Sequence, residues 1–245
     1  MKALLIDLLL FSVGALAQTT IPAGTVLPLQ LNSSLSTAKS KPGQTITARV
    51  MQDVPLAPGK KIRAGAKVVG HVVSVESARH GGPAEIQFIF NKVKFSHRSV
   101  PINAHLRALA SMTDVEEVEI PPGGTDRGTP WAWATRTLIG GEVAYGQGGP
   151  VSRGADTVGE AVVGGVLAPV SANLSAGCQG ELADNTQPQA LWLFSSNACG
   201  VYGMSGVEIA HRGRTAPVGE IKLVSKQGNF EVRGGSGLLL RINAR

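Results

Sequence analysis

The chain has 245 residues, of which 31 are Gly and only 4% are aromatic, and its 23 Lys and Arg exceed its 17 Asp and Glu to give a net charge of +6. Abundant glycine with few charged residues favours short strands joined by turns over long helices. The basic residues are scattered along the sequence and few rings could stack on bases, so nucleic acid is not expected as a partner. The positive balance is compatible with attraction to anionic envelope polymers, but an ordinary solvated surface is the favoured interpretation.

Residues 1–17 have the layout of a secretory signal peptide, with one positive charge at Lys2, an apolar stretch and a small-residue triplet that ends at Ala17. Cleavage is expected after Ala17. The apolar stretch is shorter than the roughly 20 residues of a spanning helix, and the alternatives are an uncleaved N-terminal anchor and a cytosolic helix without a lipid. This layout predicts an exported protein, periplasmic or extracellular, and no later segment is long and apolar enough to span a membrane.

Residues 18–110 are predicted to form a β-barrel-like N-terminal domain, because apolar and polar residues alternate along several segments. In 44–53 the alternation places Ile46, Ala48 and Val50 on one face. In 67–77 it places Val69, Val73 and Val75 on one side, with His71 among them. In 85–95 the apolar phase changes after Phe90, which indicates a bulge near Asn91 and Lys92.

Two similar stretches, "IPAG" at 21–24 and "IRAG" at 62–65, each precede an extended run. Gly24 and Gly65 allow a tight, left-handed backbone geometry just before a strand. Ile21 and Ile62 are expected to anchor the two turns in the core. The stretches therefore predict two equivalent turn-then-strand units in one sheet system.

Residues 111–200 are predicted to be a long, irregular insertion, since the regular alternation is lost and Gly and Pro become frequent. Residues 111–120 fit either a short helix or an acidic strand. Cys178 and Cys199, the two cysteines of the chain, are expected to form a disulfide that ties down this insertion. A metal pair is the alternative, but no His or second pair of cysteines stands at ligand spacing.

Period-two alternation returns in residues 201–245, which are predicted to form C-terminal strands that pack on or complete the β-domain. The last strand places Leu238, Leu240 and Ile242 on one face, with Leu239 and Arg241 on the other. The sequence as a whole predicts an all-β fold, a barrel or a sandwich, of short strands turned by Gly and Pro.

Residues 21–108, in which "IPAGTVLPLQL" is followed by "IRAGAKVVGHV", resemble the β-domain of TrbI-like subunits of conjugative, type IV secretion channels. The resemblance implies a β-barrel-like domain of the cell envelope. Arg63 stands where the second unit of that family has Pro. Residues 109–200 contain nothing like the apolar helices with which those subunits cross the outer membrane, so a pore is not implied. The chain also resembles a group of uncharacterised exported bacterial proteins that share "CGVYG" (199–203) and "GSGLLLR" (235–241).

Two clusters of side chains are candidates for binding. Trp131 and Trp133 would share one face of an extended segment and could stack on a sugar or peptide. His211, Arg212 and Arg214 fall in one turn, where guanidinium groups could bind a carboxylate or phosphate. Burial of the rings and a surface hairpin tip are the corresponding structural interpretations.

Sequence motifs for catalysis are missing, since the chain has neither a zinc-protease helix nor a G-x-S-x-G serine. We therefore expect no catalytic residue, metal or cofactor, and a non-enzymatic envelope protein with a structural or adaptor role whose partner is an envelope protein or polymer. The alternatives are a soluble module that binds glycan or peptidoglycan and a hydrolase whose site is assembled from distant residues.

Overall fold

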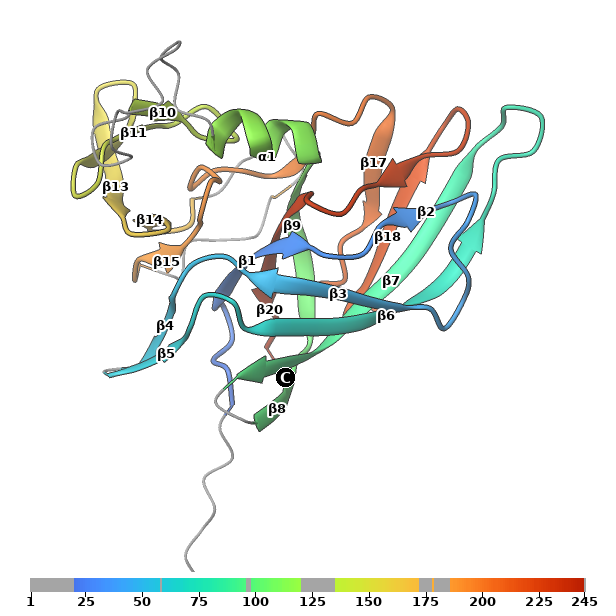
Figure 1. Ribbon diagram of the computed structural model, residues 1–245, viewed down its shortest axis with the longest axis horizontal. Coiled ribbons are helices and arrows are strands. Elements are labelled where there is room, and N and C mark those ends of the chain that lie inside the picture. Colours follow the sequence, from blue (N-terminus) through green and yellow to red (C-terminus); the bar gives the residue numbers. More distant parts are fainter. Residues whose placement is uncertain are drawn as a thin grey trace, which may run out of the picture.

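A computed structural model describes residues 20–57, 59–95, 98–119, 135–171, 178 and 186–244. The predicted signal peptide, 1–17, and the candidate rings Trp131 and Trp133 lie outside the described residues. The fold is all-β, as predicted, and in the part of the chain just defined the helix α1 (Met112–Glu119) is the single α-helix (Figure 1).

The main sheet contains ten strands and curves into a nearly closed barrel (Figure 1). Its spatial order is β16 (Gly200–Tyr202), β9 (Ala104–Ala110), β20 (Gly237–Ile242), β1 (Val26–Leu31), β3 (Thr45–Val50), β6 (Lys67–Glu76), β7 (Ala84–Phe95), β18 (Glu220–Ser225) and β17 (Val207–His211), with β8 (Arg98–Pro101) beside β7. The strand β20 lies between β9 and β1 in this sheet.

The two edges of the barrel are held together by the segment that links the edge strands and by hydrogen bonds between the edges. Its two edge strands, β16 and β17, are consecutive in the sequence and are joined by residues 203–206. The N–H of Leu106 in β9 donates to the carbonyl of Arg212, just after β17, at 2.9 Å. The Arg212 guanidinium donates to the carbonyl of Arg107 at 2.8 Å and to that of Leu106 at 3.4 Å. Arg212 therefore holds the seam of the barrel.

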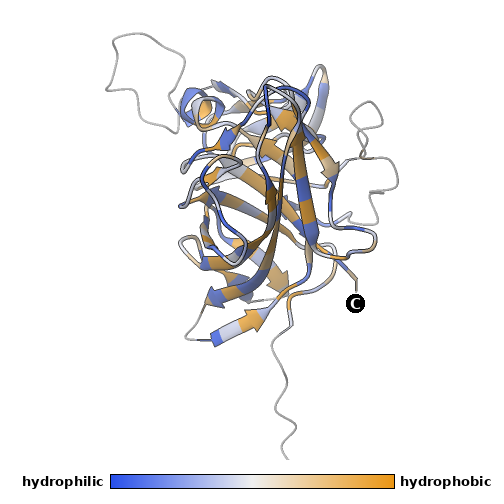
Figure 2. Ribbon diagram, turned by 90° about the vertical axis from the view of Figure 1, so that its right-hand side faces the viewer, coloured by the Kyte–Doolittle hydropathy of each residue, from blue (hydrophilic) through white to orange (hydrophobic). Residues whose placement is uncertain are grey.

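The interior of the barrel is filled by the inward residues of its strands, and Figure 2 shows these apolar segments alternating with polar ones. Ile46, Ala48 and Val50 are buried, as the alternation of β3 predicted. The predicted bulge is confirmed, because Val69 is opposite Lys92 and Gly70 is opposite Phe90, which leaves Asn91 as the extra residue of β7.

The predicted phase of β6 differs from the observed one. Val68 and Val72 are fully buried in the barrel core, whereas Val69, Val73 and Val75 are only partly buried. Both faces of this strand carry valines, so the alternation alone did not identify the inward face. A second bulge, in which Val73 is the extra residue between the paired residues Val72 and Ser74, also changes the phase along the strand.

The two predicted turn-then-strand units are confirmed, and two further turns have the same geometry. Gly24 and Gly65 have φ of 82° and 86°, and Ile21 and Ile62 are buried in the barrel core. The four turns are 22–25, 41–44, 63–66 and 233–236, and each has its glycine third, with φ between 80° and 96°, as in a type II turn. The four turns have the same backbone hydrogen bonds, and the four glycine N–H groups donate to Ile242, Val72, Val50 and Leu31 at 2.7 to 2.9 Å.

These turns act in reciprocal pairs. The turn 22–25 leads into β1 and bonds β20, while the turn 233–236 leads into β20 and bonds β1. The turns 41–44 and 63–66 relate β3 and β6 in the same way. Each strand of a pair is therefore fixed in register by the turn that precedes its neighbour.

The described part of the predicted insertion is more regular than its sequence pattern indicated. It contains a second sheet, in the order β10 (Thr135–Thr137), β11 (Val143–Tyr145), β12 (Pro150–Arg153), β13 (Asp156–Val162), β14 (Gly165–Ala168) and β15 (Gln189–Ala190). These strands are two to seven residues long. Such short strands, interrupted by glycine, give little periodic signal.

A second apolar core joins this sheet to the outside of the barrel. Val26, Ala108 and Leu239 leave the barrel on its outer face and pack with side chains of the second sheet and with Phe194. The strands β1, β9 and β20 are consequently buried on both faces. Two short ribbons complete the structure: β2 (Leu35–Ser36) with β19 (Glu231–Val232), and β4 (Val54–Ala57) with β5 (Lys60–Ile62).

The predicted disulfide between Cys178 and Cys199 is confirmed, with 6.2 Å between the two Cα atoms. Of the two alternatives for 111–120, the helix is found, and the Ser111 hydroxyl accepts the N–H of Asp114 at 3.1 Å as an N-cap. Among the residues that the structure describes, no helix has the length and apolarity that crossing a membrane requires.

Candidate functional site

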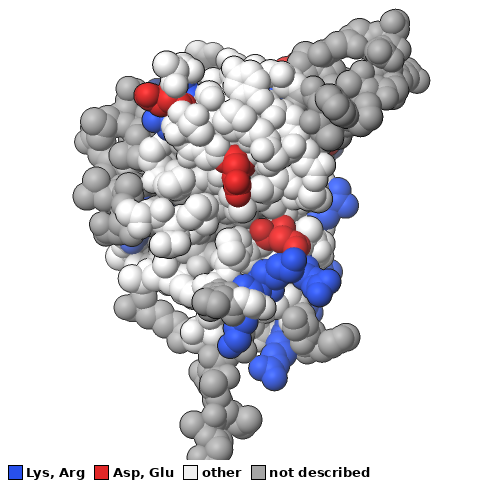
Figure 3. All heavy atoms as spheres, turned by 90° about the vertical axis from the view of Figure 1, so that its left-hand side faces the viewer, with Lys and Arg blue, Asp and Glu red and all other residues white. Residues whose placement is uncertain are grey.

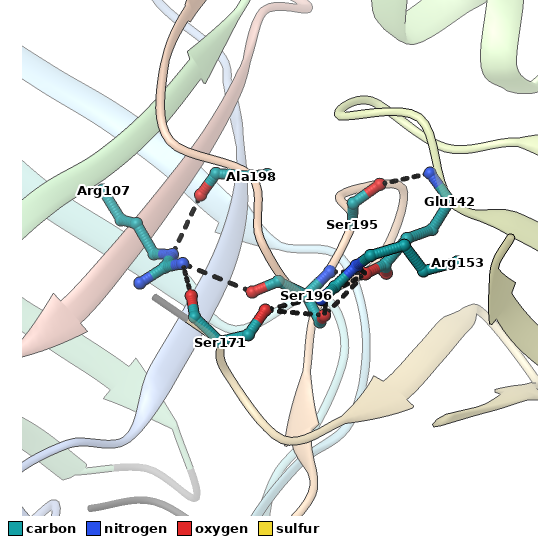
Figure 4. Close-up of polar contacts among 7 residues, drawn as sticks. All are labelled: Arg107, Glu142, Arg153, Ser171, Ser195, Ser196 and Ala198. Atoms are coloured by element: carbon teal, nitrogen blue, oxygen red, sulfur yellow. Dashed lines mark hydrogen bonds and ion pairs between the residues drawn. The ribbon is translucent and has the colours of Figure 1, made fainter. Parts of the chain in front are cut away.

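The most concentrated polar cluster of the described chain surrounds Glu142, between the second sheet and the loop 191–199 (Figure 4). The Glu142 carboxylate is 1% exposed and forms an ion pair with Arg153, whose guanidinium lies 2.6 Å from Oε1. The Ser196 hydroxyl donates to Oε1 and the Ser196 N–H donates to Oε2, both at 2.7 Å. The Glu142 N–H donates to Ser195 Oγ at 3.0 Å.

The chemistry open to this cluster is structural. Ser195 and Ser196 are at most 1% exposed, and both hydroxyls are engaged in the hydrogen bonds around Glu142. A serine nucleophile needs a base that takes its proton and a path for the substrate. The observed bonds instead fasten the loop 191–199 to the second sheet, so we assign the cluster a stabilising role.

Arg107, from β9, extends this network to the barrel (Figure 4). Its guanidinium is fully buried and donates to the carbonyls of Ala198 at 2.9 Å, Ser196 at 3.3 Å and Ser171. A buried cation is costly unless it is hydrogen-bonded, and here backbone carbonyls of two loops meet that need. Arg107 therefore fixes the disulfide-bearing region against the barrel.

The candidate cluster His211, Arg212 and Arg214 is divided by the structure. His211 Nδ1 lies 2.8 Å from the carbonyl of Glu220, and Arg212 holds the barrel seam. Arg214 is exposed and lines a separate cavity with His105 and Arg241. The three residues consequently do not form one anion site. The other candidates, Trp131 and Trp133, fall outside the described ranges.

Two ionisable groups near the end of α1 have altered proton affinities. Burial raises the pKa of Glu119, against the attraction of Arg49 and Arg136. Burial also lowers the pKa of Arg136 to about 10, which the nearby Glu119 partly opposes. Both line a cavity of about 480 Å³ with Trp192, a residue that has a left-handed φ of 55°. Perturbed groups of this kind occur in ion-pair networks as well as in active sites.

Histidines and acidic side chains are the usual components of metal and hydrolytic sites. No group of three His, Cys, Asp or Glu side chains in the described ranges is placed to hold a metal ion. The hydrogen bonds seen for His105 and His211 within those ranges go to Asn243, Thr215, Gly213 and a main-chain carbonyl.

A row of cations crosses the outer surface of the barrel. Lys67 in β6 is directly opposite Arg49 in β3 on one side and Lys94 in β7 on the other. All three are exposed, and none of them forms an ion pair with a described carboxylate. Like charges directly opposite each other in a sheet are destabilising. The row is therefore a feature that strand pairing alone does not explain.

The row belongs to a larger basic surface, which we call the basic face. Its exposed members come from β3, β5, β6, β7 and β8 and the turn before β6: Arg49, Lys60, Lys61, Arg63, Lys67, Lys92, Lys94 and Arg98. Figure 3 shows Lys and Arg side chains gathered in the lower part of one side of the molecule, next to a carboxylate. Asp53 forms an ion pair with Lys61 there, at 2.5 Å.

The charge of the β6–β7 pair is divided between its two ends. Lys67 is opposite Lys94 at one end, and Glu76 is opposite Glu85 at the other. The ten residues of β6 span about 30 Å at the rise of a strand. The Lys222 ammonium lies 2.8 Å from Glu85 at the acidic end. The basic face is therefore a local concentration of charge and not a consequence of the net charge alone.

Two hollows flank the β4–β5 ribbon within this region. One, of about 430 Å³, is lined by four cations of the basic face (Lys60, Lys61, Arg63 and Arg98) together with Phe95. The other, of about 620 Å³, shares Lys60 and Lys61 but is lined mainly by apolar groups, including Pro55, Val163 and Leu167. Val163 is 75% exposed. Positive charge and open apolar surface thus meet at one ribbon.

The sequence did not predict this surface, because its basic residues are scattered along the chain. They are separated in the chain, but the order β3–β6–β7–β8 brings them together. The available signal was a pair of dense segments, five cations between Arg49 and Lys67 and three between Lys92 and Arg98. Without the strand order, nothing showed that the two segments adjoin.

No protein-family model matches the chain, and a search of curated proteins also finds no match.

Proposed function

We propose that this protein is an exported, non-enzymatic component of the cell envelope, with a structural or adaptor role, that binds an acidic partner protein through the basic face. The observation that carries the proposal is the row Arg49–Lys67–Lys94, in which like charges are opposite one another on three adjoining strands. Local features that oppose folding stability are expected at functional sites. An acidic partner would convert these repulsions into attractions.

The hollows beside the β4–β5 ribbon favour a protein over a simple polyanion. A polyanion would use only the cations, whereas a protein surface can present carboxylates to the basic hollow and apolar side chains to Val163 and Leu167. Interfaces commonly combine an apolar centre with a charged surround. This arrangement supports an adaptor that recognises a folded partner.

Export is supported by two independent features. The segment 1–17 has the layout of a signal peptide, and the disulfide Cys178–Cys199 is of a kind that persists in oxidising compartments. The similarity of residues 21–108 to TrbI-like β-domains is consistent with an envelope location and is part of the proposal.

The test is a pair of double variants with equal changes in charge. Lys67→Glu with Lys94→Glu inverts the row, while Lys39→Glu with Lys41→Glu changes two exposed lysines before the opposite end of β3. Each variant and the wild type are cross-linked in envelope extracts, and the captured proteins are quantified.

We expect one acidic protein to be captured by the wild type and the Lys39/Lys41 variant, and its yield to fall at least tenfold for the Lys67/Lys94 variant. Capture should weaken as salt is raised, since exposed charges are screened. Equal losses in both variants would show that capture depends only on net charge and would refute the proposal. Tight binding of a DNA oligonucleotide through the same lysines would refute it in favour of nucleic acid.

A further inference from the structure

A cavity of about 540 Å³ lies where β20 ends, at the side of the barrel. Arg241, His105 and Arg214 contribute side chains to its lining, with Gly24, Val218 and Asn243 beside them, and no Asp or Glu among the described residues lines it. It shares no lining residue with either hollow of the basic face. The charged side chains of the lining are therefore all cationic. The cavity lies outside the basic face, on which the proposed function depends.

Arg241 is held in this cavity by the register of the barrel. It alternates with Leu240 and Ile242, which point into the barrel core, so its own side chain leaves the barrel on the outside. It is directly opposite His105 in β9 and Val26 in β1. Only 9% of Arg241 is exposed, and no described residue forms a hydrogen bond or ion pair with its guanidinium.

Two other arginines, one fully buried and one paired, are satisfied by the protein. Arg107 donates to three backbone carbonyls, and Arg153 pairs with Glu142. A buried cation without such partners is unfavourable. Since the cavity offers Arg241 none, a group that enters from outside is the natural source of the missing negative charge.

The orientation of the His105 imidazole is fixed by a hydrogen bond to Asn243. The Asn243 amide nitrogen donates to Asn103 Oδ1 at 2.8 Å and to the Gly213 carbonyl at 2.9 Å. Its Oδ1 therefore faces His105 Nδ1, at 2.6 Å, and this nitrogen must be the donor. The imidazole is thereby fixed beside Arg241, with its orientation set by three neighbouring segments of the chain.

We propose that this cavity binds a small organic molecule through its carboxylate or phosphate group, with Arg241 as the central contact and Arg214 at the rim. A guanidinium matches both oxyanions because it can donate two parallel hydrogen bonds. The cavity is larger than the oxyanion needs, and Val218 provides an apolar part of its wall for the remainder of the ligand. This inference does not depend on the proposed partner.

The test uses phenyl phosphate and benzoate as probes, measured by calorimetry at constant ionic strength. Arg241→Met removes the charge and keeps the length of the side chain, and Arg79→Met is the control at an exposed arginine outside the cavity. We expect at least one probe to bind the wild type and Arg79→Met with similar affinity, and Arg241→Met to bind at least tenfold more weakly. Binding of one probe and not the other identifies the oxyanion, and binding of neither overturns the inference.

A second measurement separates a ligand site from a structural charge. Without a probe, Arg241→Met should unfold at the same urea concentration as the wild type or at a higher one, because an uncompensated buried charge is removed. Marked destabilisation would mean that the guanidinium serves the fold and would overturn the inference. In the wild type, the NMR signal of Arg241 Nε–Hε should shift on addition of the binding probe, and an unchanged signal would contradict the proposal.

Discussion

Replacement of Glu142 by Gln should destabilise the fold well beyond a typical surface change. The carboxylate accepts four hydrogen bonds, two from Arg153, one from the Ser196 hydroxyl and one from the Ser196 N–H. An amide of the same shape has one acceptor oxygen and one donor nitrogen. If its oxygen faces Arg153, its nitrogen opposes the Ser196 N–H at a distance of 2.7 Å, and the reversed amide opposes Arg153.

The expected loss follows from these contacts. An unsatisfied buried N–H costs about 1–3 kcal/mol, and loss of charge from the bonds to Arg153 removes roughly another 1 kcal/mol. Arg153 is 42% exposed, so water can solvate it and the loss should stay below that of a fully buried pair. We therefore expect the free energy of unfolding to fall by about 3 kcal/mol.

Urea denaturation measures this loss, with the midpoint and slope compared between wild type and variant. Glu160→Gln is the matched control, because Glu160 is an exposed carboxylate of β13 in the same sheet, and it should change the stability by less than about 0.5 kcal/mol. A loss below about 1 kcal/mol for Glu142→Gln would show that the buried carboxylate is not needed, and the stabilising role assigned to the cluster would be refuted.

Three further predictions concern the barrel, the disulfide and one exposed ion pair. Replacing both half-cystines of the 21-residue loop by Ala should lower stability by about 3 kcal/mol, and an unchanged urea midpoint would contradict this. Gly70→Ala should lower the melting temperature more than Gly43→Ala, because a Cβ at Gly70 would lie 1.9 Å from the Ile89 carbonyl oxygen. At Gly43 a Cβ would meet no neighbour, and only the strain of a φ of 80° opposes the substitution. Equal effects would argue against the close approach of β6 and β7. The pKa of Asp53 is held below its usual value first by the hydrogen bond from Lys61 and then by the hydrogen bond from the Ala64 N–H. Ionised Asp53 therefore stabilises the fold at pH values above the ordinary pKa of Asp, and this stabilisation is lost as the pH falls through the lowered pKa of the folded state. In carbon NMR titrations Lys61→Met should raise that pKa, and an unmoved titration would refute the assigned cause.

Much of the barrel was predictable because its signals are local. The alternation of β3, the bulge at Asn91 and the turns at Gly24 and Gly65 each depend on a few adjacent residues whose backbone requirements differ clearly from those of their neighbours. The disulfide was predictable because the chain has only two cysteines. These features follow from steric and counting arguments that need no knowledge of the tertiary structure.

The surfaces and cavities were less accessible to sequence reasoning because they depend on strand order. Lys67 and Lys94 are 27 positions apart and meet only because β6 pairs with β7 in one register. Arg241 was recognised as lying on the face opposite Leu240, but its burial depends on the cavity formed with β9 and the loop after β17. Arg212 was a candidate for binding in the sequence, but it contacts backbone carbonyls across the seam of the barrel. Such contacts have no sequence signature.

The pairing of β1 with β20 has a consequence for when the protein can assume its final form. One of the two neighbours of β1 is contributed by residues 237–242, which are far from β1 in the sequence. A chain that has not yet been synthesised as far as residue 242 lacks that neighbour, so the barrel cannot close before then. Pairing over so long a loop is also slow to form. Delayed closure of this kind is compatible with the export that we propose, because an unfolded chain can pass through a narrow channel.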